Sequence, residues 1–252
     1  MPNPRVGLAL GGGAALGAAH IGVLHALAER GIEPRIVTGT SAGALVGAAF
    51  AAGLPLDLIE EQVRVAGWAT FGKFTLTPRL ALLDSSALSA SVGVLGPEPR
   101  IEHLPRRFGA VATDLRTRSS VVLTNGPLDL ALRASIAVPG LFPPISWNGR
   151  FLVDGALADN LPITPARGLG ADLVIAVRLR PGWQWPGTGR VTAATVAAAR
   201  DDGDTLIIEP DLRRLSPWSR RDVPRIIDAG RRAADTALAR FAWEIGDQDQ
   251  AS

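Results

Sequence analysis

Two long stretches near the start of the chain contain no Lys, Arg, Asp or Glu, and they constrain the fold more than any other feature. They cover residues 6–28 and 36–56, so each is long enough to cross a membrane as a helix. Glycines interrupt both: the first holds Gly11-Gly12-Gly13, and the second holds Gly39-Thr40-Ser41-Ala42-Gly43. Each stretch is therefore better explained as a short buried strand, a glycine turn and a helix.

The beginning of the chain also argues against a secretory leader. Arg5 precedes an apolar run, but Pro2, Pro4 and the glycine triplet interrupt the uniform hydrophobic segment that a leader needs. The sequence has no cysteine, which excludes disulfides, thiolate metal sites and a cysteine nucleophile and fits a reducing compartment. We therefore expect a cytoplasmic protein.

Strand and helix patterns alternate along the rest of the chain. Apolar strands are predicted over residues 6–10, 35–38, 109–114, 120–124, 151–154, 173–177 and 205–209. Helices are predicted over residues 17–30, from 39 to about 53, after 55, around 86–94, before 168 and over 223–241. No repeat or linker divides the chain, so we expect one domain over residues 1–252. Continuous apolar strands alternating with helices indicate the α/β class, with a mostly parallel sheet covered on both faces.

Charge excludes one class of partner. The chain carries 26 basic and 24 acidic side chains, and 47% of its residues are hydrophobic. Because both signs are interspersed rather than blocked, we expect no nucleic-acid partner. The hydrophobic content excludes a disordered chain.

The segment Gly39-Thr40-Ser41-Ala42-Gly43 matches Gly-x-Ser-x-Gly, with a predicted strand before it and a helix after it. In this context the serine sits on a sharp turn, and Gly39 and Gly43 allow the backbone to bend tightly and approach a second strand. The helix N-terminus also favours negative charge at that point. Ser41 is therefore a candidate nucleophile, and an ordinary helix cap is the alternative.

A serine nucleophile needs a base, and histidine is the usual one. The chain has only His20, His25 and His103, and all of them precede the acidic motif at Asp154. The order serine, acid, histidine of the α/β-hydrolases is thus absent. A carboxylate becomes the next candidate base.

Asp154 ends the predicted strand over residues 151–154 and is followed by Gly155. Side chains at such strand ends often belong to active sites, so Asp154 is the candidate base. An Asx turn is the alternative explanation, and Asp159 and Asn160 lie close enough in sequence to compete for a polar role.

The first glycine turn, over residues 10–17, could supply backbone N–H groups to an oxyanion or to phosphates. A dinucleotide fingerprint would need a third glycine where Ala14 or Leu16 stands, and an acidic residue after the second strand. Neither is present, so nucleotide binding is a minor alternative and we expect no cofactor. We also expect no metal, because no set of His, Asp and Glu has ligand spacing.

Together these motifs resemble the patatin-like phospholipases, in particular the compact bacterial members. The similar segments are residues 8–24, 39–43, 112–114, 134–140, 153–156 and 160–162. The resemblance implies a three-layer α/β/α fold and a Ser-Asp dyad that hydrolyses lipid acyl esters, with the glycine-rich loop as oxyanion hole. By position, Ser41 is the nucleophile and Asp154 the base, and the oxyanion donors are the N–H groups of Gly12, Gly13 and Ala14.

The chain departs from the family pattern at two positions. Leu16 replaces the family's Arg or Lys, and Ala14 replaces a frequent glycine. Leu16 motivates an alternative function, a lipid- or acyl-binding regulatory protein of the same fold.

A lipid or acyl-ester substrate also implies peripheral membrane contact. We expect that contact through Trp183 and Trp185, helped by Arg220 and Arg221, because such side chains suit an anionic interface.

Overall fold

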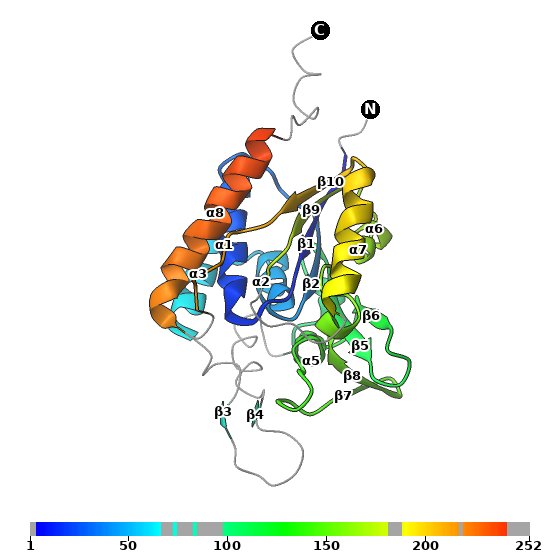
Figure 1. Ribbon diagram of the computed structural model, residues 1–252. Helices are drawn as coiled ribbons and strands as arrows, with labels where there is room; N and C mark the ends of the chain where they lie inside the picture. Colours follow the sequence, from blue (N-terminus) through cyan, green and yellow to red (C-terminus); the bar gives the residue numbers. More distant parts are fainter. Residues whose placement is uncertain are drawn as a thin grey trace.

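A computed structural model describes residues 4–66, 73–74, 83–84, 98–180, 188–216 and 219–240. An eight-stranded sheet forms its centre (Figure 1). Its strands are β1 (Val6–Leu10), β2 (Ile36–Thr40), β5 (Arg107–Asp114), β6 (Ser120–Leu123), β7 (Ile145–Trp147), β8 (Arg150–Asp154), β9 (Leu173–Val177) and β10 (Thr205–Ile208). A separate pair joins β3 (Lys73–Phe74) to β4 (Leu83–Asp84).

The sheet is mostly parallel, as the sequence predicts. Its order is β10-β9-β1-β2-β5-β8-β7, and β6 pairs with β5. All pairs from β10 to β5 are parallel, whereas β6 and β8 run antiparallel to β5 and β7 runs antiparallel to β8. Strand β1 lies in the middle of the parallel part and is almost entirely buried, which explains its continuous apolar sequence.

Helices cover both faces of the sheet (Figure 1). The α-helices are α1 (Ala18–Ala28), α2 (Ala42–Ala51), α3 (Leu56–Ala66), α5 (Leu128–Ser135), α6 (Ile163–Gly168), α7 (Thr188–Asp201) and α8 (Val223–Arg240). Short 3-10 turns are η1 (Ala14–Gly17), η4 (Ile101–His103), η5 (Gly155–Leu157) and η6 (Arg220–Asp222). Buried residues of α1, α2, α5 and α8 form two hydrophobic clusters, and α6 and α7 contribute to a third with β1 and β9.

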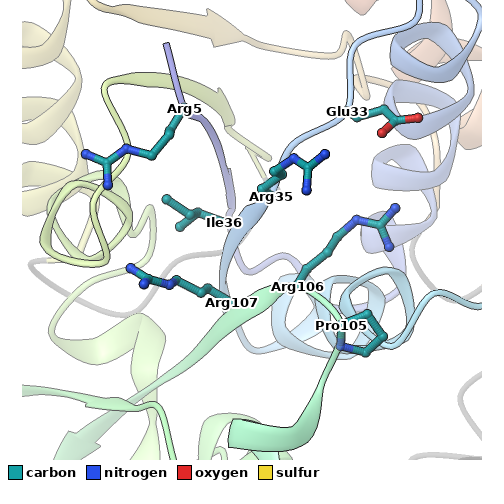
Figure 2. Close-up of a pocket in the computed structure, with 7 residues that line it drawn as sticks. All are labelled: Arg5, Glu33, Arg35, Ile36, Pro105, Arg106 and Arg107. Carbon is teal, nitrogen blue, oxygen red and sulfur yellow. The ribbon is translucent and has the colours of Figure 1, made fainter. Parts of the chain in front are cut away.

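The two ends of the parallel strands have different surroundings. Their carboxyl ends lead into the glycine turn after β1 and the serine turn after β2. Their amino ends border a pocket of about 470 Å³ (Figure 2). The chemistry expected from the sequence therefore lies at one end of the sheet and this pocket at the other.

Helices α1 and α8 cross at very short range because glycine faces backbone at the crossing. A Cβ at Gly22 would lie 1.9 Å from the carbonyl oxygen of Ile227, and one at Gly230 would lie 2.0 Å from that of Ala19. Side chains at either position would force the two helices apart.

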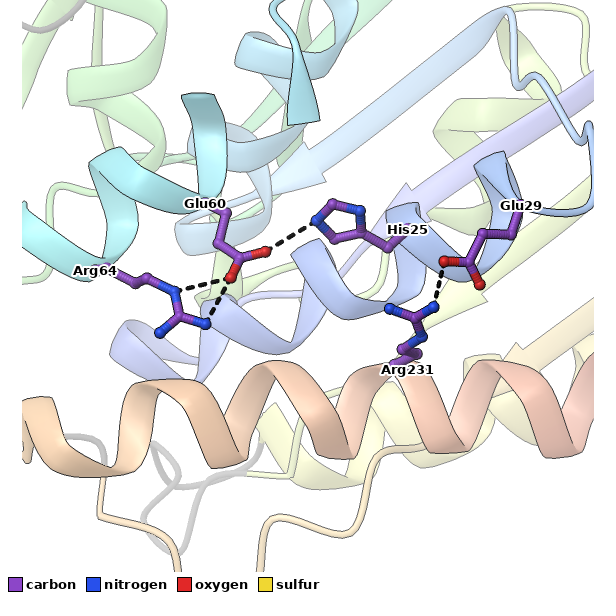
Figure 3. Close-up of polar contacts among 5 residues, drawn as sticks. All are labelled: His25, Glu29, Glu60, Arg64 and Arg231. Carbon is purple, nitrogen blue, oxygen red and sulfur yellow. Dashed lines mark hydrogen bonds and ion pairs between the residues drawn. The ribbon is translucent and has the colours of Figure 1, made fainter. Parts of the chain in front are cut away.

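Polar contacts tie α1 to both helices beside it (Figure 3). His25 Nε2 lies 2.9 Å from Glu60 Oε2 on α3, and Arg64 also pairs with Glu60. Glu29, just after α1, pairs with Arg231 of α8. These contacts fix the helix that follows the glycine turn.

The predicted strands are all present, within a few residues of their expected ends. The sequence pattern does not predict β7, α5 or α7. The helix expected around residues 86–94 and the membrane-contact candidates Trp183 and Trp185 lie outside the described residues, as does the side chain of Arg220. Within the described ranges, no helix has the length and apolar character needed to span a bilayer.

Candidate active site

Strand register brings Ser41 and Asp154 together although they are 113 residues apart. On β5, Ala110 pairs with both β2 and β6, and Ala112 pairs with both β6 and β8. A strand residue has one neighbour on each edge, so β2 and β8 share the edge opposite β6. Thr40 pairs with Val111 and Asp154 with the next residue, so the carboxyl ends of β2 and β8 meet head to head.

Ser41 forms a strained turn between β2 and α2. Its backbone has φ 53° and ψ −120°, a conformation that a non-glycine residue rarely adopts. The flanking glycines make this turn possible, because a Cβ at Gly39 would lie 2.4 Å from the Gly43 carbonyl oxygen and one at Gly43 would lie 2.1 Å from that of Leu10. The turn predicted from Gly-x-Ser-x-Gly is therefore present.

The buried hydroxyl of Ser135 supports this turn. It accepts a hydrogen bond from the Ser41 N–H at 2.9 Å and donates to the Val111 carbonyl at 2.7 Å. Ser135 thus ties the serine turn to β5, and the strain at Ser41 is held by the surrounding structure. Ser135 lies in the family-like segment 134–140, but the sequence alone indicates no role for it.

Ser41 and Asp154 are in direct contact. The Ser41 hydroxyl donates to Asp154 Oδ2 at 2.9 Å, and the Ala156 N–H donates to Asp154 Oδ1 at 2.8 Å. Burial raises the pKa of Asp154 to about 6, although these two hydrogen bonds lower it. A carboxylate of this basicity is better suited to accept a hydroxyl proton than one at the ordinary value of 3.8.

The glycine turn lies beside the serine turn. A Cβ at Gly12 would be 3.2 Å from Ser41 Cβ. The Gly12 N–H already donates to the backbone oxygen and to Oδ1 of Asn160, each at 3.2 Å. The N–H groups of Gly13 and Ala14 have no acceptor among the described residues. Of the three expected donors, Gly12 is therefore engaged and the other two are free.

Two threonines of β2 hold the segment that anchors the glycine turn. Thr38 Oγ1 donates to the Pro162 carbonyl and Thr40 Oγ1 to the Asp159 carbonyl, both at 2.8 Å. Asn160 lies between these two attachment points and accepts from Gly12. The signal for this role was the pair of hydroxyls in a fully buried strand, because buried hydroxyls need partners.

His20 contacts the glycine turn but not Ser41. Its Nε2 lies 2.8 Å from the Gly11 carbonyl oxygen, so it carries the proton and donates, whereas Nδ1 has no hydrogen-bond partner among the described residues. Burial lowers the pKa of His20 to about 4, which keeps the ring neutral. His25 contacts Glu60 and His103 is exposed.

The remaining expected residues lie around this centre. Asp159 is half-buried, and burial raises its pKa to about 6, although the Leu161 N–H lowers it. Leu16 is 2% exposed and packs in a hydrophobic cluster with α1 and α8.

Within the described part of the chain, no three His, Asp or Glu side chains gather as a metal site would require.

Sequence comparisons identify the family and several relatives of the chain. A family model described as patatin-like phospholipase matches residues 8–167. An uncharacterized NTE family protein of Mycobacterium tuberculosis is 46% identical over 190 residues, which cover 70% of this chain and 49% of that protein. A second one from that organism is 31% identical over 272 residues, covering 92% and 46%. The chain thus spans about half the length of these relatives.

Other proteins match part of the chain or share its fold. A patatin-like phospholipase domain-containing protein of Caenorhabditis elegans is 39% identical over 181 residues, covering 68% of this chain and 13% of that protein. The crystal structure of VipD from Legionella pneumophila has a TM-score of 0.58 and 15% identity, covering 94% of this chain and 67% of VipD. ExoU from Pseudomonas aeruginosa has a TM-score of 0.51 and 16% identity, covering 94% and 52%. At these identities the two structures show the fold alone.

Proposed function

Because the chain belongs to the patatin-like phospholipase family, we propose that it hydrolyses acyl esters of lipids, as a phospholipase A, lysophospholipase or esterase. The observation that carries this proposal is the 2.9 Å hydrogen bond from Ser41 Oγ to a buried carboxylate, Asp154, at the meeting point of two strands. We also propose that residues 1–252 form a single hydrolase domain, since strands from residue 6 to residue 208 share one sheet.

In the first step, Ser41 Oγ attacks the ester carbonyl carbon and its proton moves to Asp154 Oδ2. The carbonyl oxygen becomes an oxyanion, which accepts hydrogen bonds from the Gly13 and Ala14 N–H groups. These donors lie on backbone that is anchored before the reaction, so little reorganisation is needed when charge develops. Gly12 can become a third donor only by giving up Asn160.

Collapse of the tetrahedral intermediate breaks the bond to the leaving alcohol, which takes the proton back from Asp154. The acyl group then remains on Ser41. Water attacks this acyl-enzyme while Asp154 accepts its proton, and the second collapse releases the fatty acid and returns the proton to Ser41. Asp154 must be ionised at the start of each half-reaction.

The proposal is tested with purified protein and a series of esters of increasing acyl chain length, including phospholipids, lysophospholipids and neutral esters. We expect turnover of at least one class and covalent labelling of Ser41 by a fluorophosphonate, which reacts with activated serines. Peptide mass mapping identifies the labelled residue. Binding of lipid without turnover or labelling would instead support the regulatory alternative.

Access to lipid substrates implies contact with a membrane surface. We expect weak sedimentation with anionic liposomes, and we expect the double change Trp183→Ala and Trp185→Ala to reduce it while hydrolysis of a short soluble ester stays near normal. Equal loss of vesicle and soluble-ester turnover would place these tryptophans in the core or the substrate pocket.

A further inference from the structure

At the end of the sheet away from Ser41, a pocket of about 470 Å³ opens between the starts of three parallel strands (Figure 2). Arg5 precedes β1, Arg35 precedes β2, and Arg106 and Arg107 lie at the start of β5. Of the described residues that line the pocket, Glu33 is the single acidic one. Four arginines therefore line this pocket together with one carboxylate.

Within the described part of the chain, only one of these four arginines has an acidic partner. Arg5 is neutralised by Asp172, with Nε 3.0 Å from Oδ2. Among the described residues, Arg35, Arg106 and Arg107 form no ion pair within 4.0 Å. Several arginines elsewhere in the described structure have an acidic partner, for example Arg30 with Asp235, Arg225 with Asp222 and Arg178 with Glu209. Because acids and bases are nearly balanced over the chain, this cluster of unpaired arginines is a local excess of positive charge.

Uncharged groups hold two of these three guanidinium groups in place, those of Arg106 and Arg107. Arg106 Nη1 donates to the Phe50 carbonyl at 2.9 Å, and its guanidinium lies 4.3 Å from the centre of the Phe50 ring. Arg107 Nη1 donates to the Leu169 carbonyl at 3.1 Å. A guanidinium has five N–H donors, so both keep donors for a ligand while part of their rotamer freedom is already lost.

The side chains approach the pocket from two sides. Figure 2 shows Arg35 and Arg106 on the side of Glu33, and Arg5 and Arg107 on the other. A single small anion would engage one of these sides, whereas a ligand with two separated charges can engage both. The rigid fork of arginine matches the oxygens of phosphate.

We infer that this pocket binds a small phosphate-bearing ligand with at least two negative charges, held by Arg35, Arg106 and Arg107. Arg35 and Ser41 flank the five residues of β2, so six residue steps separate them by roughly 20 Å. A ligand here does not touch the reacting atoms, so the inference is independent of the proposed hydrolysis. The pocket and Ser41 lie at opposite ends of the sheet, which favours a water-soluble ligand over a headgroup in the bilayer being hydrolysed.

Pyrophosphate is the probe, and isothermal titration at low salt is the measurement. We expect binding that weakens as sodium chloride is raised, because exposed charges are screened by salt. Arg35→Gln should weaken binding about tenfold, since it removes charge-assisted hydrogen bonds. Arg35→Lys, which keeps the charge but loses the fork, should fall between Arg35→Gln and the wild type. The Ser41→Ala protein should bind as the wild type does, so failed hydrolysis and failed binding are told apart.

Arg232→Gln is the matched control, because Arg232 is an exposed arginine on α8 and the change removes the same charge. The inference is overturned if pyrophosphate does not bind at low salt, or if Arg232→Gln weakens binding as much as Arg35→Gln does.

Phosphatidylcholine vesicles containing a phosphoinositide bisphosphate distinguish the source of the phosphate. Vesicle binding that Arg35→Gln removes would support the same chemistry and assign it to a lipid headgroup. Binding of pyrophosphate without vesicle binding would assign it to a soluble phosphate.

Discussion

The turn after β1 and the turn after β2 lie side by side, yet they present different parts of the chain. The first is a loop of several residues that presents the backbone N–H groups of Gly13 and Ala14, which have no acceptor in the described part of the chain. The second is a single strained residue, Ser41, whose side chain reaches Asp154. A turn that presents backbone depends on its anchors, whereas a turn that presents a side chain also depends on the identity of that residue.

Their supports differ accordingly. The glycine turn is held from outside by Asn160 and His20, and it keeps its N–H groups although Ala14 and Leu16 depart from the family pattern. The serine turn can form because Gly39 and Gly43 have no side chains, and the hydroxyl of Ser135 holds it in place. Substitutions should therefore have graded effects at the first turn and severe effects at the second.

The largest effect should come from the reacting pair. Ser41→Ala and Asp154→Asn should each lower kcat by about 10³-fold or more, and the double variant should lose no more, because both groups serve one step. Initial rates on a soluble ester and circular dichroism provide the measurement. His20, His25 and His103, replaced singly, are the companion test. If one of them abolishes turnover in a natively folded protein, a histidine base must be considered.

Gly43→Ala should break the serine turn by steric conflict. The new methyl group would lie 2.1 Å from the Leu10 carbonyl oxygen, so β1 or α2 must shift, at a cost of about 3 kcal/mol in unfolding free energy. Urea denaturation measures this. Gly168→Ala is the control, because a Cβ there meets nothing within 4 Å and stability should hardly change. Equal stability of the two variants would show that the turn is not tightly packed.

The pH dependence should report on Asp154. Its ionised form is the base and its pKa is about 6, so kcat/KM should fall about tenfold per pH unit below that value. Asp159 shares this raised pKa but does not contact Ser41, so Asp159→Asn should leave the profile unchanged. If Asp159→Asn shifts the pH profile, the titrating carboxylate is Asp159 and our assignment to Asp154 is wrong.

The same pKa shift has a consequence for stability. The folded pKa of Asp154 lies above its ordinary value of 3.8, so between these values the unfolded chain releases the proton first. Ionisation therefore destabilises the fold as pH rises from about 4 to about 6, and this loss persists at neutral pH. Thermal melts should show Asp154→Asn gaining stability relative to wild type over that range.

Loss of an anchor should weaken the glycine turn without removing its donors. Asn160→Ala deletes the Oδ1 that accepts from Gly12, and we expect kcat to fall about tenfold while KM stays nearly constant, because the oxyanion exists only after attack. Asp159→Asn again serves as the neighbouring control. A change in KM alone would indicate that Asn160 shapes substrate binding.

The smallest effect should come from Ala14. Its φ of 53° is costly for alanine, and relief of this strain should exceed the entropy cost of glycine by about 0.5 to 1 kcal/mol. Ala14→Gly should therefore raise the melting temperature slightly and leave kinetics unchanged. Ala15→Gly, at a residue without positive φ, should lower it. The opposite order would mean that this turn relaxes in solution.

Local pattern was enough to predict most strands and the two turns. The strands over Val6–Leu10 and Leu173–Val177 have the predicted bounds, because continuous buried runs carry a strong signal. The three-residue strand β7 and the eight-residue helix α5 were not predicted, since segments this short depend on tertiary packing. The fourteen-residue α7 was also missed, because its alanine- and threonine-rich sequence gives only a weak apolar periodicity.

The sequence by itself determined which residue types could act: a serine between glycines, an aspartate at a strand end, and no histidine after it. Tertiary structure decided that Ser41 and Asp154 meet, because the local pattern does not specify which edge of β5 each strand occupies. It also decided that Asn160 holds Gly12 and that arginines preceding separate strands line one pocket. The physical reason is common to all three cases: periodicity reports burial of a segment, whereas a contact between distant segments is set by strand order and register.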